Sequence, residues 1–178
     1  MKEEGFSILV KGNEELEALY EKINIGQKGI SEFIIKLAPH RKDVDKIIKS
    51  YKFHYANGRV VNDRALELVA NLRKKYKVYC YTDCIKENYE VNLEKGIYKD
   101  FDDVFKSYEF GMKKKHPNAF PTLLKRIKLK GEECFFIDDH PVNIENAKKS
   151  GLHVIHYTQF PDVEPILKGL RELGVEIG

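Results

Sequence analysis

The sequence predicts an α/β fold in which one parallel sheet lies between two layers of helices. From residue 61 onward, short apolar runs alternate with helical patterns, and this alternation favours parallel strands joined by helices. Two of the runs end in polar side chains, at Thr82-Asp83 and at Asp138-Asp139. The length of 178 residues fits a single core with a small insertion.

Composition restricts the function classes. The chain is 42% hydrophobic and has a net charge of +3 with both signs interspersed, which permits anionic substrates but does not demand nucleic acid. No apolar run approaches the ~18 residues that a membrane helix needs, and the run at 6–10 is too short for a signal peptide. Of the three cysteines, Cys80 and Cys134 lie in apolar runs and are expected to be buried free thiols, and Cys80 and Cys84 lack the second ligand pair that a zinc site needs. The odd number of cysteines favours a reducing, cytoplasmic setting. We expect neither a nucleic-acid nor a membrane partner.

Residues 1–60 are expected to form a mostly helical region, and residues 61–178 the α/β core. Apolar periodicity and cap residues predict helices at 14–22, 33–37 and 43–51, with Asn13 as the first N-cap. Asn57-Gly58 is a turn signal. The apolar run at 6–10 fits a short strand or the start of a helix.

In the core, strands and helices alternate. We expect strands at 77–81, 103–107, 134–138 and 153–157, and helices at 62–72, 85–94, 117–127, 141–149 and 163–173. The carboxyl ends of the strands in such a sheet are where ligands bind.

The strand that ends in Asp138 and Asp139 carries the strongest chemical signal. Pro141 can open a helix directly after it, so both carboxylates lie in a strand–loop–helix turn. Adjacent carboxylates repel each other unless a cation lies between them, and hard oxygen ligands suit Mg²⁺ held together with a phosphate. The alternative is that both side chains merely cap the next helix and face water.

Two further segments supply groups at strand ends. Thr82 offers a hydroxyl, and the loop at 111–117 offers an ammonium from Lys113, Lys114 or Lys115. A hydroxyl, a lysine and a pair of metal-binding acids around one crevice are the parts required for phosphoryl transfer.

These segments together resemble the haloacid dehalogenase (HAD) superfamily, in particular its phosphatase-like members with a small helical cap. Residues 78–83 look like the second motif, residues 114–117 like the third, and residues 136–143 like the metal-binding form of the fourth. The resemblance implies a three-layer Rossmann-like core at 61–178 and a cap at 1–60. It also implies a Mg²⁺-dependent phosphatase of a small phosphorylated metabolite rather than a dehalogenase.

The resemblance assigns roles to individual residues. The implied set is Thr82 and Lys114 for catalysis, these two with Asp83 for phosphate binding, Asp138 and Asp139 for Mg²⁺, and His140 and Asn143 as supporting groups. Lys115 stands where the family usually has proline, so Lys113 and Lys115 remain alternatives to Lys114. For His140 the alternative is a surface position, and for Asn143 a place in the first helical turn.

The chain departs from the family at the first motif, a strand ending in Asp-x-Asp whose aspartates act as nucleophile and as general acid and base. No apolar strand followed by Asp-x-Asp precedes Thr82, and the run at 6–10 leads instead into Lys11-Gly12-Asn13. In the family, that strand lies between those of the second and fourth motifs. We therefore expect the N-terminal strand to be missing and a gap to lie between Cys80 and Phe136.

Three interpretations of this departure stay open. The chain is a fragment that begins just after the first motif, or it is a non-catalytic binding or interaction module in which the run at 6–10 fills the gap. In the third, Asp83 is a substitute nucleophile or another chain supplies the strand. We expect weak or no turnover, and an unfilled gap would favour a homo-oligomer.

Two other function classes fit less well. The stretch at 51–55 is aromatic and basic, as in single-strand nucleic-acid binders, but it ends a helical pattern and fits packing of the helical region on the core better. A flavodoxin-like domain would share the architecture, but we find no glycine-rich phosphate loop.

Overall fold

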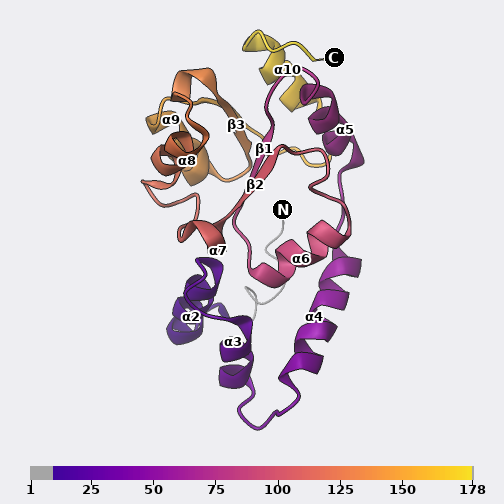
Figure 1. The fold of residues 1–178 in the computed structure, drawn as a ribbon, viewed down its shortest axis with the longest axis vertical. Helices are drawn as coiled ribbons and strands as arrows, with labels where there is room; N and C mark the ends of the chain where they lie inside the picture. The colour runs from indigo at the N-terminus through magenta and orange to yellow at the C-terminus, as the bar shows by residue number, and fades with distance from the viewer. Residues whose placement is uncertain (1–9, 178) are drawn as a thin grey trace.

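The computed structural model describes residues 10–177, in which helices alternate with short parallel strands (Figure 1). The N-terminal helices are α2 (Glu14–Asn24), α3 (Ile30–Leu37) and α4 (Val44–Gly58). The rest comprises α5 (Asp63–Leu72), β1 (Tyr79–Thr82), α6 (Lys86–Glu94), β2 (Asp103–Lys106), α7 (Ser107–Phe110), α8 (Ala119–Ile127), the 3₁₀ helix η1 (Gly131–Glu133), β3 (Phe135–Asp138), α9 (Pro141–Lys149), β4 (His153–His156) and α10 (Glu164–Glu172).

The strands form two parallel pairs. Tyr79 of β1 lies opposite Asp103 of β2, and Phe135 of β3 lies opposite His153 of β4. Within residues 10–177, β1 and β3 are not hydrogen-bonded to each other, so the parallel sheet is divided at the place where the sequence predicted a gap. One alternative predicted from the sequence is that the run at 6–10 fills this gap. Residues 6–9 of that run lie outside the described part of the chain.

Helices cover both faces of the strand pairs and make three layers. One apolar cluster joins α8 and α9 to both pairs through Tyr81, Phe105, Phe136 and Val154. A second cluster joins α5 and α10 to Ile155 and the start of β1. Figure 1 shows α8 and α9 on one side of the strands and α5 on the other. The predicted α/β architecture with parallel strands is thus confirmed, and the two strand pairs share their cores.

Helices α2 to α4 lie beyond the carboxyl ends of β1 and β2, next to α6 and α7 (Figure 1). Ile23, Phe33 and Ile34 bury their side chains together with Ile85, the residue directly before α6. The helical region is therefore packed on the segment that follows β1.

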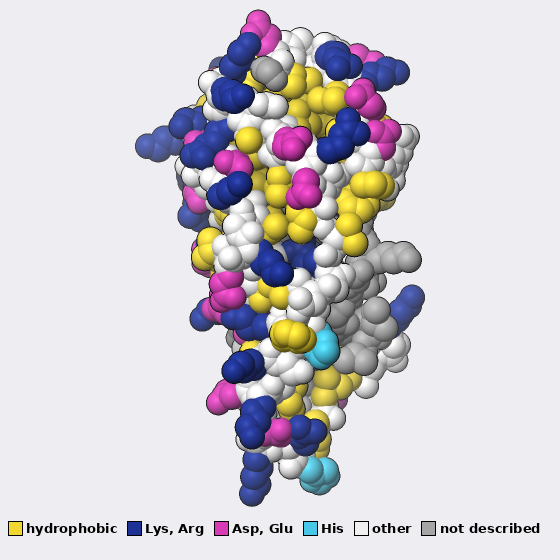
Figure 2. All heavy atoms as spheres, turned by 90° about the vertical axis from the view of Figure 1, so that its right-hand side faces the viewer, with side chains coloured by type: hydrophobic (Ala, Val, Ile, Leu, Met, Phe, Trp, Pro, Cys, Tyr) yellow, Lys and Arg dark blue, Asp and Glu magenta, His cyan; other side chains and the backbone are white. Residues whose placement is uncertain are grey.

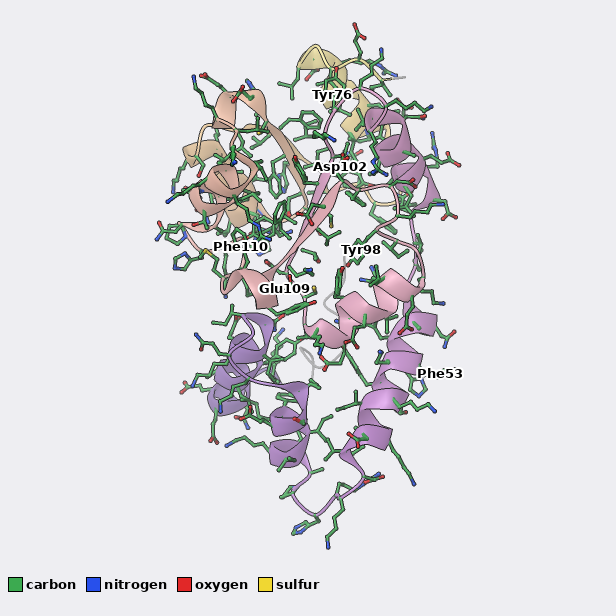
Figure 3. The ribbon with its side chains drawn as sticks, viewed as in Figure 1. Phe53, Tyr76, Tyr98, Asp102, Glu109 and Phe110 are labelled. Atoms are coloured by element: carbon green, nitrogen blue, oxygen red, sulfur yellow. The ribbon has the colours of Figure 1, made fainter. Side chains whose placement is uncertain are left out.

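The aromatic stretch at the end of α4 packs on α6. Tyr51 donates a hydrogen bond to Asn88 Oδ1 at 2.7 Å, and Lys52 Nζ lies 3.0 Å from Glu90 Oε2. Phe53, in contrast, points to the outer side of the helix (Figure 3). This packing agrees with the interpretation preferred from the sequence over nucleic-acid binding.

Charges on the face shown in Figure 2 agree with the composition. Lys and Arg side chains are interspersed with acidic and apolar ones along this face of the described residues, rather than gathered in one basic stripe. Within the same residues, no helix has the length and apolar character needed to cross a membrane.

Cys80 and Cys134 are free thiols, as predicted, but they are half-buried rather than buried, and Cys84 is a buried free thiol. Burial raises the pKa of the Cys80 thiol to about 11 and that of Cys84 to about 12, so both stay protonated at neutral pH.

Several predicted boundaries differ from the observed ones by one to three residues or more, and two of the differences have a clear physical cause. Helix α4 continues through Asn57-Gly58 instead of ending near residue 51. Two contacts stabilise the longer helix: Tyr51 bonds Asn88 of α6, and Asn57 Nδ2 donates to the carbonyl of Phe53 at 2.7 Å. Ser107 begins α7 instead of ending the strand, and its hydroxyl turns into the core.

Gly26, two residues after the end of α2, lies against the backbone of Tyr108 in α7. Its φ is +74°, and a Cβ there would collide with the carbonyl of Tyr108. Gly96, directly after α6, has a similar φ of +70° but open space around it. We expect Gly26→Ala to lower the free energy of unfolding by about 1–3 kcal/mol more than Gly96→Ala does, measured by urea denaturation. Equal losses would mean that this contact is not formed.

Candidate active site

The candidate site lies at the carboxyl ends of the strands. Thr82 is the last residue of β1 and Asp138 the last residue of β3. The loop at 111–117, called the lysine loop below, follows α7. In Figure 3, Glu109 and Phe110 of α7 lie at the opposite end of β2 from Asp102, so the lysine loop starts at the carboxyl end of the strands.

Lys114 and Asp138 form a buried ion pair at this end. Lys114 Nζ lies 2.6 Å from Asp138 Oδ2, and the two side chains are only 14% and 5% exposed. Burial alone would lower the pKa of Lys114, but the carboxylates of Asp138 and Asp83 outweigh it and hold the pKa above its usual value. The lysine therefore stays charged where it faces the two acids.

Asp83 links the end of β1 to the lysine loop. Its carboxylate accepts the backbone N–H of Lys114 at 3.0 Å through Oδ1 and at 3.3 Å through Oδ2. Burial raises the pKa of Asp83, and the charge of Lys114 acts against that rise. Thr82, next to it, is half-buried at the same strand end.

The second oxygen of Asp138 is also occupied. Oδ1 accepts the backbone N–H of His140 at 2.8 Å and Asn143 Nδ2 at 3.0 Å. The alternative that both aspartates face water is therefore wrong for Asp138, whereas the side chain of Asp139 is exposed. Asn143 thus bonds Asp138, whereas the supporting role suggested from the sequence was a bond to Asp139.

His140 has two local contacts. Its N–H bonds Asp138, and its ring Nδ1 accepts the N–H of Val142 at 3.2 Å, which caps α9. The residue is otherwise exposed.

The three lysines of the loop have different ion-pair partners. Lys113 Nζ and Lys115 Nζ lie 3.1 and 3.0 Å from Oε1 of Glu21 on α2, whereas Lys114 alone of the three is paired with Asp138. The geometry thus favours Lys114 over both alternatives that the sequence left open.

Two further polar residues hold the site together and were missed from the sequence. Ser107, completely buried, accepts the N–H of Cys84 at 3.0 Å and donates to its carbonyl at 3.2 Å. This pair of bonds fixes the turn after Thr82 against the end of β2. Asn146 of α9 donates to the carbonyls of Lys115 at 2.8 Å and Lys114 at 3.4 Å. A polar residue at a strand end was the available signal for Ser107; nothing local marks Asn146.

The oxygen donors of the site fit Mg²⁺ by their chemistry. Asp138 and Asp139 offer carboxylates and Asn143 an amide oxygen, and Mg²⁺ is commonly held by one or two carboxylates completed by water and phosphate. Within residues 10–177, no three His, Cys, Asp or Glu side chains converge in a way that could hold a metal. A protein cage is thus absent from the described part, and oxygens of water or phosphate would complete the coordination.

An Asp-x-Asp sequence does occur at Asp43-Val44-Asp45, but it is not at a strand end. It begins α4 at the far end of the helical region (Figure 1), and Asp43 accepts two hydrogen bonds from Arg41 at 2.7 and 2.6 Å. These acids cannot serve the strand-end site.

The buried ion pair generates a stability prediction. Lys114→Met leaves the carboxylate of Asp138 without its cation, and we expect a loss of about 3 kcal/mol in the free energy of unfolding at pH 7, measured by urea denaturation. Lys113→Met in the same loop removes a partly exposed pair, whose side chains are 21% and 44% exposed, and should cost only about 1 kcal/mol. Adding Asp138→Asn to Lys114→Met should recover part of the loss, and a fully additive second loss would contradict the pairing.

Solved structures with the same fold belong to HAD enzymes. A HAD family enzyme from Bacteroides thetaiotaomicron, crystallised with magnesium, superposes with a TM-score of 0.75 at 20% identity over 89% of this chain and 83% of that one. The same enzyme with magnesium and inorganic phosphate gives 0.72 at 21% identity over 88% and 84%. A HAD-like family hydrolase from Porphyromonas gingivalis gives 0.74 at 20% identity over 96% and 88%.

A curated relative is similar over a shorter stretch. Glyceraldehyde 3-phosphate phosphatase of Methanocaldococcus jannaschii is 39% identical over 67 residues, which are 37% of this chain and 29% of that enzyme. The match thus spans less than a third of the relative's length.

The family itself follows from a longer match. The family model of haloacid dehalogenase-like hydrolases matches residues 4–151, most of the chain. With parallel strands, helices on both faces and acids at the strand ends, the architecture agrees with that assignment. The chain belongs to the haloacid dehalogenase-like hydrolases.

Proposed function

We propose that this chain binds the phosphoryl group of a small phosphorylated metabolite at the carboxyl ends of β1 and β3, as a Mg²⁺-dependent phosphatase site does. The observation that carries the proposal is the buried Lys114–Asp138 pair, 2.6 Å apart, beside the hydroxyl-bearing end of β1. At a site from which water is largely excluded, the ammonium of Lys114 suits the phosphate anion and the carboxylate of Asp138 suits the accompanying Mg²⁺.

Each residue has a distinct task in this proposal. Lys114 neutralises phosphate charge, Thr82 donates its hydroxyl to a phosphate oxygen, and Asp83 holds the backbone of Lys114 by the bond at 3.0 Å. Asp138 and Asp139 would hold Mg²⁺, which when bound shields phosphate charge and polarises the phosphorus centre. Asn143 keeps Asp138 in place through its bond at 3.0 Å, and His140 supports the same carboxylate through its backbone.

Residues 1–60 act as the cap in this proposal, and residues 61–178 as the core. The helices α2 to α4 lie beyond the strand ends, where a cap would cover a bound ligand. Two likenesses support a small phosphorylated substrate: the M. jannaschii relative is named for a sugar-phosphate substrate, and a neighbour was crystallised with magnesium and phosphate.

Turnover is expected to be weak or nil. Asp83, the candidate substitute nucleophile, directs both carboxylate oxygens to the N–H of Lys114. A carboxylate so engaged is poorly placed to attack phosphorus. A catalytically inactive ligand-binding or protein-interaction module is therefore the second candidate. The edges of β1 and β3 that stay unpaired within residues 10–177 favour association into a homo-oligomer.

Calorimetry and phosphate release test the proposal on the full chain. We expect inorganic phosphate to bind in the presence of Mg²⁺, and Lys114→Met to weaken binding at least about tenfold because the cation facing the anion is lost. Lys125→Met, an exposed lysine of α8, is the matched control and should bind like the parent chain. Phosphate binding that Lys114→Met leaves unchanged would contradict the proposed site.

Release of phosphate from a generic aryl phosphate separates the two candidates. Little or no Mg²⁺-dependent release, combined with intact phosphate binding, favours the inactive module. Robust release that Asp83→Asn alone abolishes would instead identify Asp83 as the nucleophile.

A further inference from the structure

The lysine loop is held by side chains from three separate parts of the chain. At the end of β1, the carboxylate of Asp83 accepts the N–H of Lys114 at 3.0 Å. From α9, Asn146 Nδ2 donates to the carbonyl of Lys115 at 2.8 Å. These two contacts fix the backbone of the loop but leave the directions of the three lysine side chains undetermined.

Glu21 of α2 provides the third contact. Its Oε1 lies 3.1 Å from Lys113 Nζ and 3.0 Å from Lys115 Nζ, so one carboxylate engages both neighbours of Lys114. Three consecutive ammonium groups repel one another, and each of them could pair with the acids at the strand ends. By engaging the outer two, Glu21 leaves Lys114 as the lysine of this loop that faces Asp138.

The position of Glu21 depends on how α2 sits on the core. Five residues after Glu21 in the sequence, Gly26 approaches the backbone of Tyr108 so closely that no Cβ fits, and Tyr108 lies in α7 just before the lysine loop. Ile23 of the same helix is buried with Ile85, which follows the turn of Asp83. Helix α2 is thus anchored on both sides of the loop, and a shift of α2 would separate Glu21 from the lysines.

We propose that Glu21 is a positioning residue that couples the helical region to the site by selecting Lys114 as the phosphate-facing lysine. The proposal rests on the proposed function for the role of Lys114, whereas the restraint itself can be tested without any ligand. If Glu21 acts only through Lys113 and Lys115, it should affect neither loop exchange nor phosphate affinity once both lysines have been replaced.

Amide hydrogen exchange of the full chain tests the restraint. In Glu21→Gln we expect exchange at residues 111–116 to be about three- to tenfold faster, because one partly buried and one exposed ion pair restrain this loop. Glu14→Gln removes the same charge from the same helix, about 10 Å away along its axis, and should leave the loop unchanged. Faster exchange throughout α2 without a specific effect on the loop would overturn the proposal.

A double-mutant comparison separates positioning from general stabilisation. In a Lys113→Gln/Lys115→Gln background, adding Glu21→Gln should change neither loop exchange nor the affinity for inorganic phosphate. An effect of Glu21→Gln that persists in this background would overturn the proposal.

Phosphate affinity adds an independent readout. Glu21→Gln in the parent chain should weaken phosphate binding about three- to tenfold, because the outer lysines become free to compete for Asp138. If the parent chain binds no phosphate, the proposed function fails, while loop exchange still decides whether Glu21 restrains the lysines. If phosphate binds and Glu21→Gln leaves its affinity unchanged, the coupling to Lys114 is wrong.

Discussion

The buried ion pair between Lys114 and Asp138 connects the two halves of this fold. The described strands form the pairs β1–β2 and β3–β4, with no backbone hydrogen bond between β1 and β3. Shared apolar clusters hold the pairs together on both faces, but at the carboxyl ends the connection is polar. It runs from Asp83 through Lys114 to Asp138, and the geometry of the site depends on that chain of contacts.

The helical region takes part in this arrangement. Helix α2 is packed against α7 and contributes Glu21 to the lysine loop, while α4 lies along α6 through Tyr51 and Lys52. A contact at α2 therefore reaches the strand ends through one loop. The helical region is physically linked to the groups that we propose to bind phosphate.

Local sequence patterns were enough to predict the four described strands and the longer helices, because periodicity and caps act within a few residues. They could not choose among three consecutive lysines, since the deciding acid, Glu21, lies 92 residues before Lys113. Asn146 was missed for a similar reason, because its partners are backbone carbonyls more than 30 residues away. The turn signal at Asn57-Gly58 failed because tertiary packing of α4 on α6 extended the helix.

The most direct test is the position of a bound phosphate analogue. A crystal of the full chain grown with Mg²⁺ and tungstate would locate the anion by anomalous scattering. The account predicts tungstate within hydrogen-bond distance of Thr82 Oγ1 and Lys114 Nζ, at the carboxyl ends of β1 and β3. Tungstate bound elsewhere, with Lys114 still paired to Asp138 and the strand ends free of anion, would contradict it.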